Sequence, residues 1–375
     1  MLRTVFPKAP RVVNHRFFIE YDPLLGWKKI PNLHGVQESD EYKIYESINS
    51  KGIRGPEYDY TKKAGEYRVL ILGDSSAEGY TVNFGELFSE VMKKKLNHES
   101  GRYYEVINAG TRGYSTDQEL LFFQQEGKKY NPDLTILTFN LNDVWYNNQL
   151  QYWIASKPLF KLENNELHLT DAPTPKPKPI AHGTRSIKEW FSENSYLYNL
   201  VQDRIKNSFL YGVAIKLGFV PYPDEFRVLK TDYDQDIREA WWMTEALLVQ
   251  LKDETQSIGS QLLIFTIPFR ASYYEEEWRA MKRRYGLSDD GWDVERDKVE
   301  LETICKRNKI DCIDPTAHFV EEARRLKSSG KRLNFLKDGH WTVEGHKLAG
   351  EILAEYIRQN YLMTKSLQSK QVSSP

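Results

Sequence analysis

A serine and a histidine from opposite halves of the chain could cooperate in nucleophilic catalysis. Ser75 ends the motif GDS, directly after the apolar run YRVLIL, and His340 lies in the motif DGHW near the other end of the sequence. A serine hydroxyl is a weak nucleophile at neutral pH until a base takes its proton. Asp338 precedes His340 by two residues, a spacing that lets a looped segment turn the carboxylate back to the ring and fix its tautomer. The three residues predict acyl transfer through an acyl-enzyme.

Acyl transfer also needs donors for the negative charge that develops on the carbonyl oxygen, each typically worth roughly 3 kcal/mol. Two further motifs supply candidates, GTRGYSTDQE and NLND. The expected donors are the backbone N–H groups of Ser75 and Gly113 and the side-chain amide of Asn142. Glycine suits position 113 because it lets the backbone approach a ligand closely. Asp74 and Asp143 are expected to hold the loops.

Each of these residues also has an ordinary structural interpretation. Ser75 could cap the next helix, Gly113 could be a turn glycine, and Asn142 could belong to a turn. His346 and Trp341 are expected to pack near the last helix and beside the catalytic histidine. The remaining histidines lack metal-ligand spacing, no zinc motif occurs, and neither a phosphate loop nor a dinucleotide fingerprint is present. The sequence therefore predicts no metal and no cofactor.

The elements that must position these motifs alternate between strand and helix. The expected strands are YRVLILG, YYEVINAG, LTILTF, QLLIFTIP and a short one at 310–313. The expected helices cover 86–98, 120–130, 186–210, 236–256, 293–308, 316–327 and 343–360. Thr116 and Glu119 have the spacing of a capping box before the second helix. This alternation predicts βαβ units and a parallel sheet, with functional residues at the carboxyl ends of its strands.

The expected fold is a flavodoxin-like three-layer α/β/α sandwich with additions. Residues 1–65 are punctuated by Pro and Gly, which predicts an irregular extension of short strands and turns. The main domain is expected at 66–362, and 363–375 as a flexible tail. A cap is expected at about 144–258, between the third and fourth strands, because long insertions are usually functional or disordered. Its aromatic content favours a folded, partly helical cap beside the active site.

The four motifs together resemble the four blocks of the SGNH (GDSL) hydrolase family. GDSS, GTRGYSTDQE, NLND and DGHW occur in the family's order, over roughly 67–145 and 261–360. The resemblance implies that the nucleophile is Ser75, that Gly113 and Asn142 hold the oxyanion, and that Asp338 and His340 are the acid and the base. The N-terminal YDPLLGW and NSKGIRGPEY resemble a leader of bacterial members that are often linked with cell-surface carbohydrate.

Two positions depart from the family pattern. Asn140 stands where the third block usually has glycine, and a side chain there could narrow the site or reorient the loop that carries Asn142. DGHWT resembles the form found in carbohydrate O-acetyltransferases of the wider superfamily. Because water or a sugar hydroxyl can discharge the same acyl-enzyme, hydrolysis and transfer both stay open.

The expected function is a serine esterase for short-chain, above all acetyl, esters, with carbohydrate as a candidate carrier of the ester. One alternative is a carbohydrate O-acyltransferase. Another is a non-catalytic glycan-binding protein on the same scaffold, and a third is an interaction protein whose insertion docks a partner. The sequence leaves the natural substrate and the oligomeric state open.

Composition excludes several other classes. Apolar residues make up 40% and charged residues 28% of the 375 residues, which suits a packed core. With 52 basic and 53 acidic residues the net charge is −1, so no general attraction to nucleic acid or anionic membrane is expected. Cys305 and Cys312 are interpreted as buried, small apolar residues.

The start of the sequence lacks the apolar core of a signal peptide, and no stretch is long enough to span a bilayer. The chain is therefore expected to be cytoplasmic by default. A piece cut from an anchored protein would read the same, so association with the cell envelope stays open.

Overall fold

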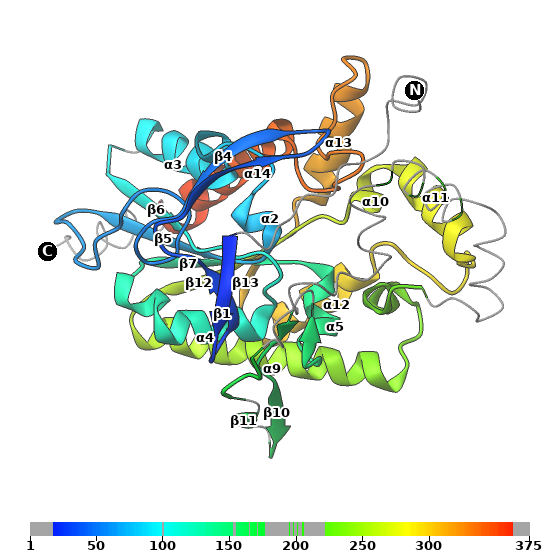
Figure 1. Cartoon of the computed structure of the whole chain (residues 1–375), viewed down its shortest axis with the longest axis horizontal. Coiled ribbons are helices and arrows are strands. Elements are labelled where there is room, and N and C mark those ends of the chain that lie inside the picture. The colour runs from blue at the N-terminus through cyan, green and yellow to red at the C-terminus, as the bar shows by residue number, and fades with distance from the viewer. Residues whose placement is uncertain are drawn as a thin grey trace, which may run out of the picture.

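A five-stranded parallel sheet forms the centre of the computed structural model (Figure 1). The model describes residues 18–99, 101–152, 155–164, 166–170, 172–176 and 222–362, with the single residues 195, 198, 201 and 205. The strands are β5(Tyr67–Leu72), β6(Tyr104–Asn108), β7(Leu134–Phe139), β12(Gln261–Thr266) and β13(Asp311–Ile313). Their spatial order is β13-β12-β7-β5-β6. Numbered along the chain, this is the 2-1-3-4-5 order of a flavodoxin-like sheet, and the predicted fold class is confirmed.

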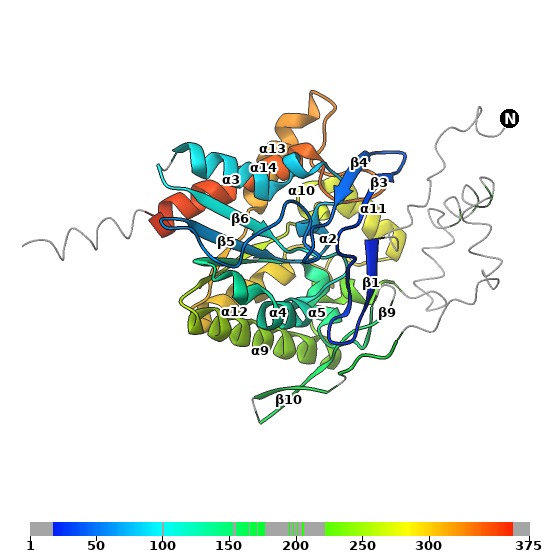
Figure 2. The same ribbon diagram turned by 60° about the vertical axis from the view of Figure 1, so that its left-hand side comes forward.

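Helices cover both faces of the sheet (Figures 1 and 2). One layer consists of α3(Phe88–Glu99), α13(Thr316–Lys327) and α14(Val343–Ile357), and the other of α4(Thr116–Gln125), α9(Gln235–Ser257) and α12(Arg296–Asn308). Further helical elements complete the domain: α2(Ser75–Glu78), η2(Phe84–Glu86), η3(Gly127–Tyr130), α10(Arg270–Tyr273), α11(Glu275–Tyr285) and η5(Arg358–Leu362). No helix within the described ranges combines the length and apolarity that a bilayer crossing requires.

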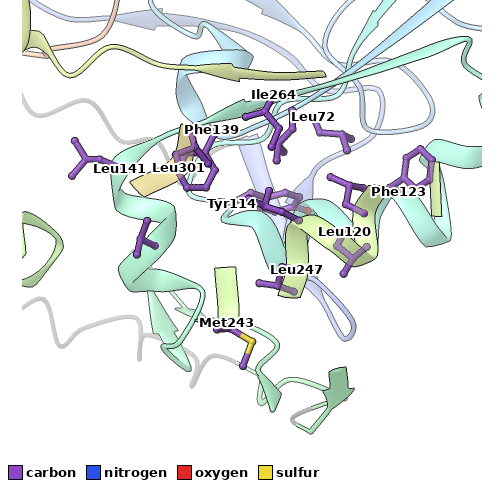
Figure 3. Close-up of a cluster of buried hydrophobic side chains, with 14 of the residues drawn as sticks. Leu72, Tyr114, Leu120, Phe123, Phe139, Leu141, Met243, Leu247, Ile264 and Leu301 are labelled. Carbon is purple, nitrogen blue, oxygen red and sulfur yellow. The ribbon is translucent and has the colours of Figure 1, made fainter. Parts of the chain in front are cut away.

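The two layers have separate hydrophobic cores because neighbouring side chains of a strand point to opposite faces. All six residues of β5 are buried. Ile71 packs in the core of the α3, α13 and α14 layer, and Leu72 packs in the core of the α4, α9 and α12 layer. Figure 3 shows the second core, where Leu72 and Ile264 of the sheet approach Leu120 and Leu247 of the helices.

The described part of the N-terminal extension, residues 18–65, contains two hairpins that pack on the main domain. β1(Ile19–Asp22) pairs with β2(Gly26–Lys29), and β3(His34–Glu38) pairs with β4(Lys43–Ser47). Trp27 is buried, and its indole N–H donates to the backbone oxygen of Arg112 over 3.0 Å. The division of the chain at residue 65 stays a prediction.

The segment between β7 and β12 contains α5(Leu141–Tyr146), β8(Gln151–Tyr152), β9(Ala155–Ser156), β10(Phe160–Glu163), β11(Glu166–Leu169), η4(Asp224–Leu229) and α9. The strands pair as two small hairpins, β8 with β9 and β10 with β11. α9 packs against β12 and α4 with a buried apolar face, and is the crossover helix that a parallel sheet requires. The helix predicted at 186–210 and the tail predicted at 363–375 lie outside the described residues, apart from the single positions 195, 198, 201 and 205.

The predicted capping box of α4 is displaced by one residue. The N-cap is Ser115, whose partner is Gln118, rather than the predicted pair Thr116 and Glu119. The box needs the N-cap backbone to be extended, and Ser115 has this conformation with φ −125° and ψ 174°. Glu119 is consequently buried inside the domain, where burial raises the pKa of its carboxyl group well above the usual value.

The two cysteines form a disulfide, so their interpretation as unpaired apolar residues is wrong. Lys309 ends α12 in the left-handed conformation with φ 54°. The chain therefore turns back into β13, and the Cα atoms of Cys305 and Cys312 come within 6.3 Å. This separation is within the range that a disulfide needs.

A buried group of charged side chains joins the N-terminal extension to the sheet. The Arg112 guanidinium, 2% exposed, donates to both carboxylate oxygens of Glu46 on β4 over 3.0 Å. It also donates through Nε to Glu78 at the end of α2 over 3.0 Å. Burial opposes the ionisation of Glu78, but the charges of Arg112 and Lys29 hold its pKa below the usual value. One arginine thus ties three segments of the chain together.

Replacing this arginine should destabilise the fold strongly. Arg112→Met leaves two buried carboxylates without their main counter-charge, which typically costs about 3–5 kcal/mol in the free energy of unfolding. Urea denaturation at pH 7 measures the change. The control is Arg283→Met, which removes an exposed arginine of α11 and should leave the midpoint nearly unchanged. A similar small effect in both variants would contradict the role of the buried group.

Candidate active site

The local fold presents Ser75 at the carboxyl end of β5. Gly73 has φ 155°, and a Cβ atom there would lie 1.8 Å from Thr138 Oγ1 on the neighbouring strand, so only glycine fits. Asp74 is the N-cap of α2, and its Oδ1 accepts from the Ser76 backbone N–H over 2.7 Å. Ser75 follows as the first residue of the helix. The capping role considered for Ser75 therefore belongs to Asp74, and the Ser75 side chain is turned elsewhere.

The structure brings Ser75 and His340 into contact across 265 sequence positions. Ser75 Oγ lies 2.7 Å from His340 Nε2. The other ring nitrogen, Nδ1, lies 2.6 Å from Asp338 Oδ1. The two contacts form a continuous Ser–His–Asp chain with the order of atoms that a nucleophile, a base and an orienting carboxylate need.

Two tyrosine hydroxyls surround Asp338. Tyr42 donates to Asp338 Oδ2 over 3.0 Å. Tyr80 lies 3.3 Å from both carboxylate oxygens and 3.0 Å from His340 Nδ1. Burial would raise the pKa of Asp338, but hydrogen bonds and charge from His340, with the Tyr42 hydroxyl, lower it to about 2. Asp338 is therefore ionised at neutral pH and can fix the orientation of the imidazole.

Sequence reasoning missed both tyrosines. Tyr80 lies five residues after Ser75, just beyond α2, and this closeness to the GDS motif was the one available signal. Tyr42 comes from the turn region before β4 in the extension. No motif marks it, and only the folded chain brings it to Asp338.

The third motif begins with an asparagine that joins two loops. Asn140 Nδ2 donates to Asp74 Oδ2 over 3.1 Å, and its backbone N–H donates to Asp143 Oδ2 over 2.9 Å. Both acids thus hold loops. Asn142 lines the same pocket as Ser75, and its Nδ2 donates to the hydroxyl of Tyr152 over 3.1 Å. With a side chain at position 140, Asn142 still lines the pocket at Ser75.

Gly113 lies in the turn after β6, half-exposed, with φ 77°. Its neighbour Arg112 anchors this turn, because the Arg112 backbone N–H donates to Glu78 Oε2 over 2.6 Å. Gly113 is not among the residues that line the pocket at Ser75. The structure thus brings Ser75, Asn142, Asp338 and His340 into one pocket, and the oxyanion role of Gly113 stays a prediction.

The pocket at Ser75 has a volume of about 410 Å³, within the usual range for small-molecule sites. Aromatic side chains line it from several elements, among them Tyr152 of β8, Phe226 of η4 and Phe269 before α10. Glu225 and Arg270 also belong to the lining of this pocket. The segment between β7 and β12 therefore contributes to the lining of the pocket, and the cap at about 144–258 stays a prediction.

His346 and Trp341 pack in the interior, as expected. His346 is buried, and its Nδ1 accepts from the Phe88 backbone N–H over 3.3 Å. Burial lowers the pKa of His346 to about 3, so the ring is neutral. Trp341 packs edge-on against Phe88 and also borders the pocket. Within the described ranges, no group of three or more His, Cys, Asp or Glu side chains is arranged to hold a metal ion.

No protein-family model matches the chain. An uncharacterized protein of Mycoplasma pneumoniae is 25% identical over 164 residues. The aligned part covers 41% of this chain and spans only 18% of the length of that protein.

Several solved structures resemble the chain at a distance. TesA is 12% identical with a TM-score of 0.37, over 78% of this chain and 98% of TesA. The acetyl xylan esterase AlAXEase is 14% identical with a TM-score of 0.41, over 77% of this chain and 99% of that one. A catalytic mutant of Axe2, an acetylxylan esterase from Geobacillus stearothermophilus, is 14% identical with a TM-score of 0.39, over 79% and 95%. These likenesses do not establish what the chain does.

Proposed function

We propose that the chain is a serine ester hydrolase of the SGNH type, with Ser75, His340 and Asp338 as its catalytic triad. The observation that carries this proposal is the unbroken chain of contacts from Ser75 Oγ through both nitrogens of His340 to Asp338. Such a chain turns a weakly nucleophilic hydroxyl into one that attacks carbonyl carbon.

In the first half of the proposed reaction, Ser75 Oγ attacks the ester carbonyl carbon while His340 Nε2 takes the hydroxyl proton. The carbonyl oxygen becomes an oxyanion, held by the Ser75 backbone N–H, the Asn142 amide and the Gly113 backbone N–H. The C–O bond to the alcohol then breaks, and His340 gives its proton to the departing oxygen. The products are the free alcohol and an ester of the acyl group with Ser75.

In the second half, water attacks the acyl-serine and His340 takes one of its protons. A second oxyanion forms at the same donors, and the C–O bond to Ser75 breaks with return of the proton to Oγ. The products are a carboxylic acid and the free serine. A sugar hydroxyl in place of water would give an acylated sugar, which is the transferase alternative.

The pocket favours a short acyl group on a polar alcohol. Its aromatic side chains supply flat apolar surfaces, and Tyr152 also carries a hydroxyl. Glu225 and Arg270 supply hydrogen-bonding groups at the wall. Rings with a polar edge, combined with charged groups, suit carbohydrate esters. We therefore propose acetyl or other short-chain esters of carbohydrate as the substrate class.

The disulfide bears on the compartment. Disulfides persist in oxidising compartments and are rare in the cytosol. The bridge between Cys305 and Cys312 therefore weighs against the cytoplasmic default expected from the sequence, and we propose an oxidising compartment, which fits the envelope association left open there.

The reactivity of Ser75 can be measured without knowing the substrate. A fluorophosphonate should label the native protein once, because the activated Oγ attacks phosphorus and displaces fluoride. Mass spectrometry of the digested protein should place the label on the peptide with Ser75. Ser75→Ala should abolish labelling, and Ser76→Ala should keep it because the Ser76 hydroxyl lies near Asn140 rather than His340. Equal labelling of native and urea-unfolded protein would show that Ser75 is not activated.

Turnover of p-nitrophenyl acetate tests the triad. Ser75→Ala and His340→Ala should each lower kcat by roughly three or more orders of magnitude, because the residues act as one unit. Asp338→Asn should lower it by roughly 10⁴ through the wrong tautomer of His340. His318→Ala, which changes an exposed histidine of α13, is the control. Full activity of Ser75→Ala would contradict the proposed triad. In a separate assay with an excess of acceptor sugar, formation of acylated sugar would favour the transferase alternative.

The amide of Asn142 should matter in the transition state more than in binding. Loss of one oxyanion donor typically costs roughly 10²–10³ in kcat, and Asn142→Ala should show this loss with little change in KM. Asn148→Ala, on the half-exposed segment after α5, should behave like the parent. Steady-state kinetics with the same ester measures both. A raised KM with unchanged kcat would assign Asn142 to ground-state binding instead.

A further inference from the structure

The loop that carries Asp338 and His340 is held by a carboxylate from the N-terminal extension. Glu41 Oε1 accepts from the Leu336 backbone N–H over 2.9 Å. The Lys337 backbone N–H lies 3.1 Å from Oε1 and 3.0 Å from Oε2. The Asp338 backbone N–H donates to Oε2 over 2.8 Å. One side chain thus binds three consecutive amides, nearly 300 positions further along the chain.

The loop needs such an acceptor because of its own conformation. It connects α13 with α14 and closes on itself through two backbone hydrogen bonds, from Phe335 N–H to the His340 oxygen over 2.9 Å and from Gly339 N–H to the Phe335 oxygen over 3.1 Å. The three amides between these bonds point out of the loop, toward Glu41. Successive amides that converge on one point form an anion site, and hydrogen bonds to a charged acceptor are roughly twice as strong as neutral ones.

Glu41 is itself fixed within the extension. Ser39 Oγ accepts from the backbone N–H groups of Glu41 and Tyr42 over 3.1 and 3.2 Å. The Ser39 N–H donates to the Tyr42 oxygen over 2.8 Å, which closes the turn between β3 and β4. The carboxylate is therefore presented by a tight turn rather than by a free segment.

Neighbouring residues of the same turn reach the same loop. Tyr42 donates to the Asp338 carboxylate over 3.0 Å, and its ring lies 5.4 Å from that of Phe335. Asp40 pairs with the Lys337 ammonium over 3.0 Å. The turn therefore contacts both the backbone and the side chain of Asp338.

We propose that Glu41 is a positioning residue of the active site, which holds the loop so that His340 stays on Ser75. The proposal rests on the proposed function. Glu41 does not line the pocket, so it acts through Asp338 and His340 rather than on the substrate. A displacement of about 1 Å in a catalytic group can cost roughly 10²-fold in rate, and three amide contacts oppose such a displacement.

The substitution Glu41→Gln keeps the size of the side chain and removes its charge. We expect kcat for p-nitrophenyl acetate to fall by roughly 10- to 100-fold while KM stays within about twofold. The matched control is Glu38→Gln, on the same hairpin, where the carboxylate is exposed and pairs with Lys43 over 3.1 Å. Both variants are assayed well below their melting temperatures, because a merely structural role would lower Tm without this split between kcat and KM.

Amide hydrogen exchange supplies a second measurement that does not depend on activity. In the parent, the amides of 336–338 should exchange slowly, and Glu41→Gln should speed their exchange while Glu38→Gln should not. Faster exchange together with the loss of kcat supports the proposal. Unchanged exchange, or unchanged kcat in an active protein, overturns it.

Failure of the ester hydrolase assignment can be distinguished from failure of the proposal for Glu41. If the parent turns over no ester, or if Ser75→Ala is as active as the parent, the assignment of the triad falls. Exchange at 336–338 then decides whether Glu41 holds the loop. If the amides of 336–338 still exchange slowly in Glu41→Gln, the proposal that Glu41 holds the loop is wrong as well.

Discussion

A charge that is buried must meet its counter-charge inside the protein, and the placement of Arg112 satisfies this constraint for three parts of the chain at once. Glu78 belongs to the short helix that begins at Ser75, Glu46 belongs to the extension, and Arg112 precedes Gly113 in the second motif. Separation of either carboxylate from the guanidinium inside the protein would leave a buried charge unpaired, which is strongly destabilising. The Arg112 guanidinium therefore couples the positions of α2, of the turn at Gly113 and of the hairpin formed by β3 and β4.

The acid–base loop depends on the extension in the same way. Its amides have a carboxylate partner, and its aspartate has two hydroxyl partners, one of which, Tyr42, lies in the extension. The sheet and the buried group around Arg112 position Ser75, whereas the loop of Asp338 and His340 receives contacts from Glu41 and Tyr42, which precede the first central strand. The turn between β3 and β4 is thus in direct contact with the loop that carries Asp338 and His340.

Sequence reasoning reached the sheet and the motifs because their signals are local. Runs such as LTILTF are apolar throughout, as expected for strands that are buried on both faces. Because functional residues gather at the carboxyl ends of parallel strands, the sequence could predict that Ser75 and the NLND motif lie at the same edge of the sheet. Glu41 and Tyr42 could not be predicted, because no motif marks them and their partners are distant in sequence. For Tyr80 the only signal was its closeness to the GDS motif, and its partners Asp338 and His340 are equally distant. The predicted N-cap of α4 was wrong by one residue. Ser115 and Thr116 both have hydroxyl groups that could cap the helix, and only the backbone conformation determines which of them does. The disulfide depends on Lys309, which ends α12 in the left-handed conformation. Glycine is the usual residue in this conformation, so the lysine gave no signal for the turn.

The sequence distance between Glu41 and its amide partners has a consequence for biosynthesis. The ribosome makes chains from the N-terminus, and domains fold as units once their residues are available. Ser75 and the turn that carries Glu41 leave the ribosome before the loop of Asp338 and His340, and His340 follows Ser75 by 265 positions. A nascent polypeptide therefore carries Ser75 well before His340 is made, and the contact between the two side chains can form only after the loop of His340 has been synthesised.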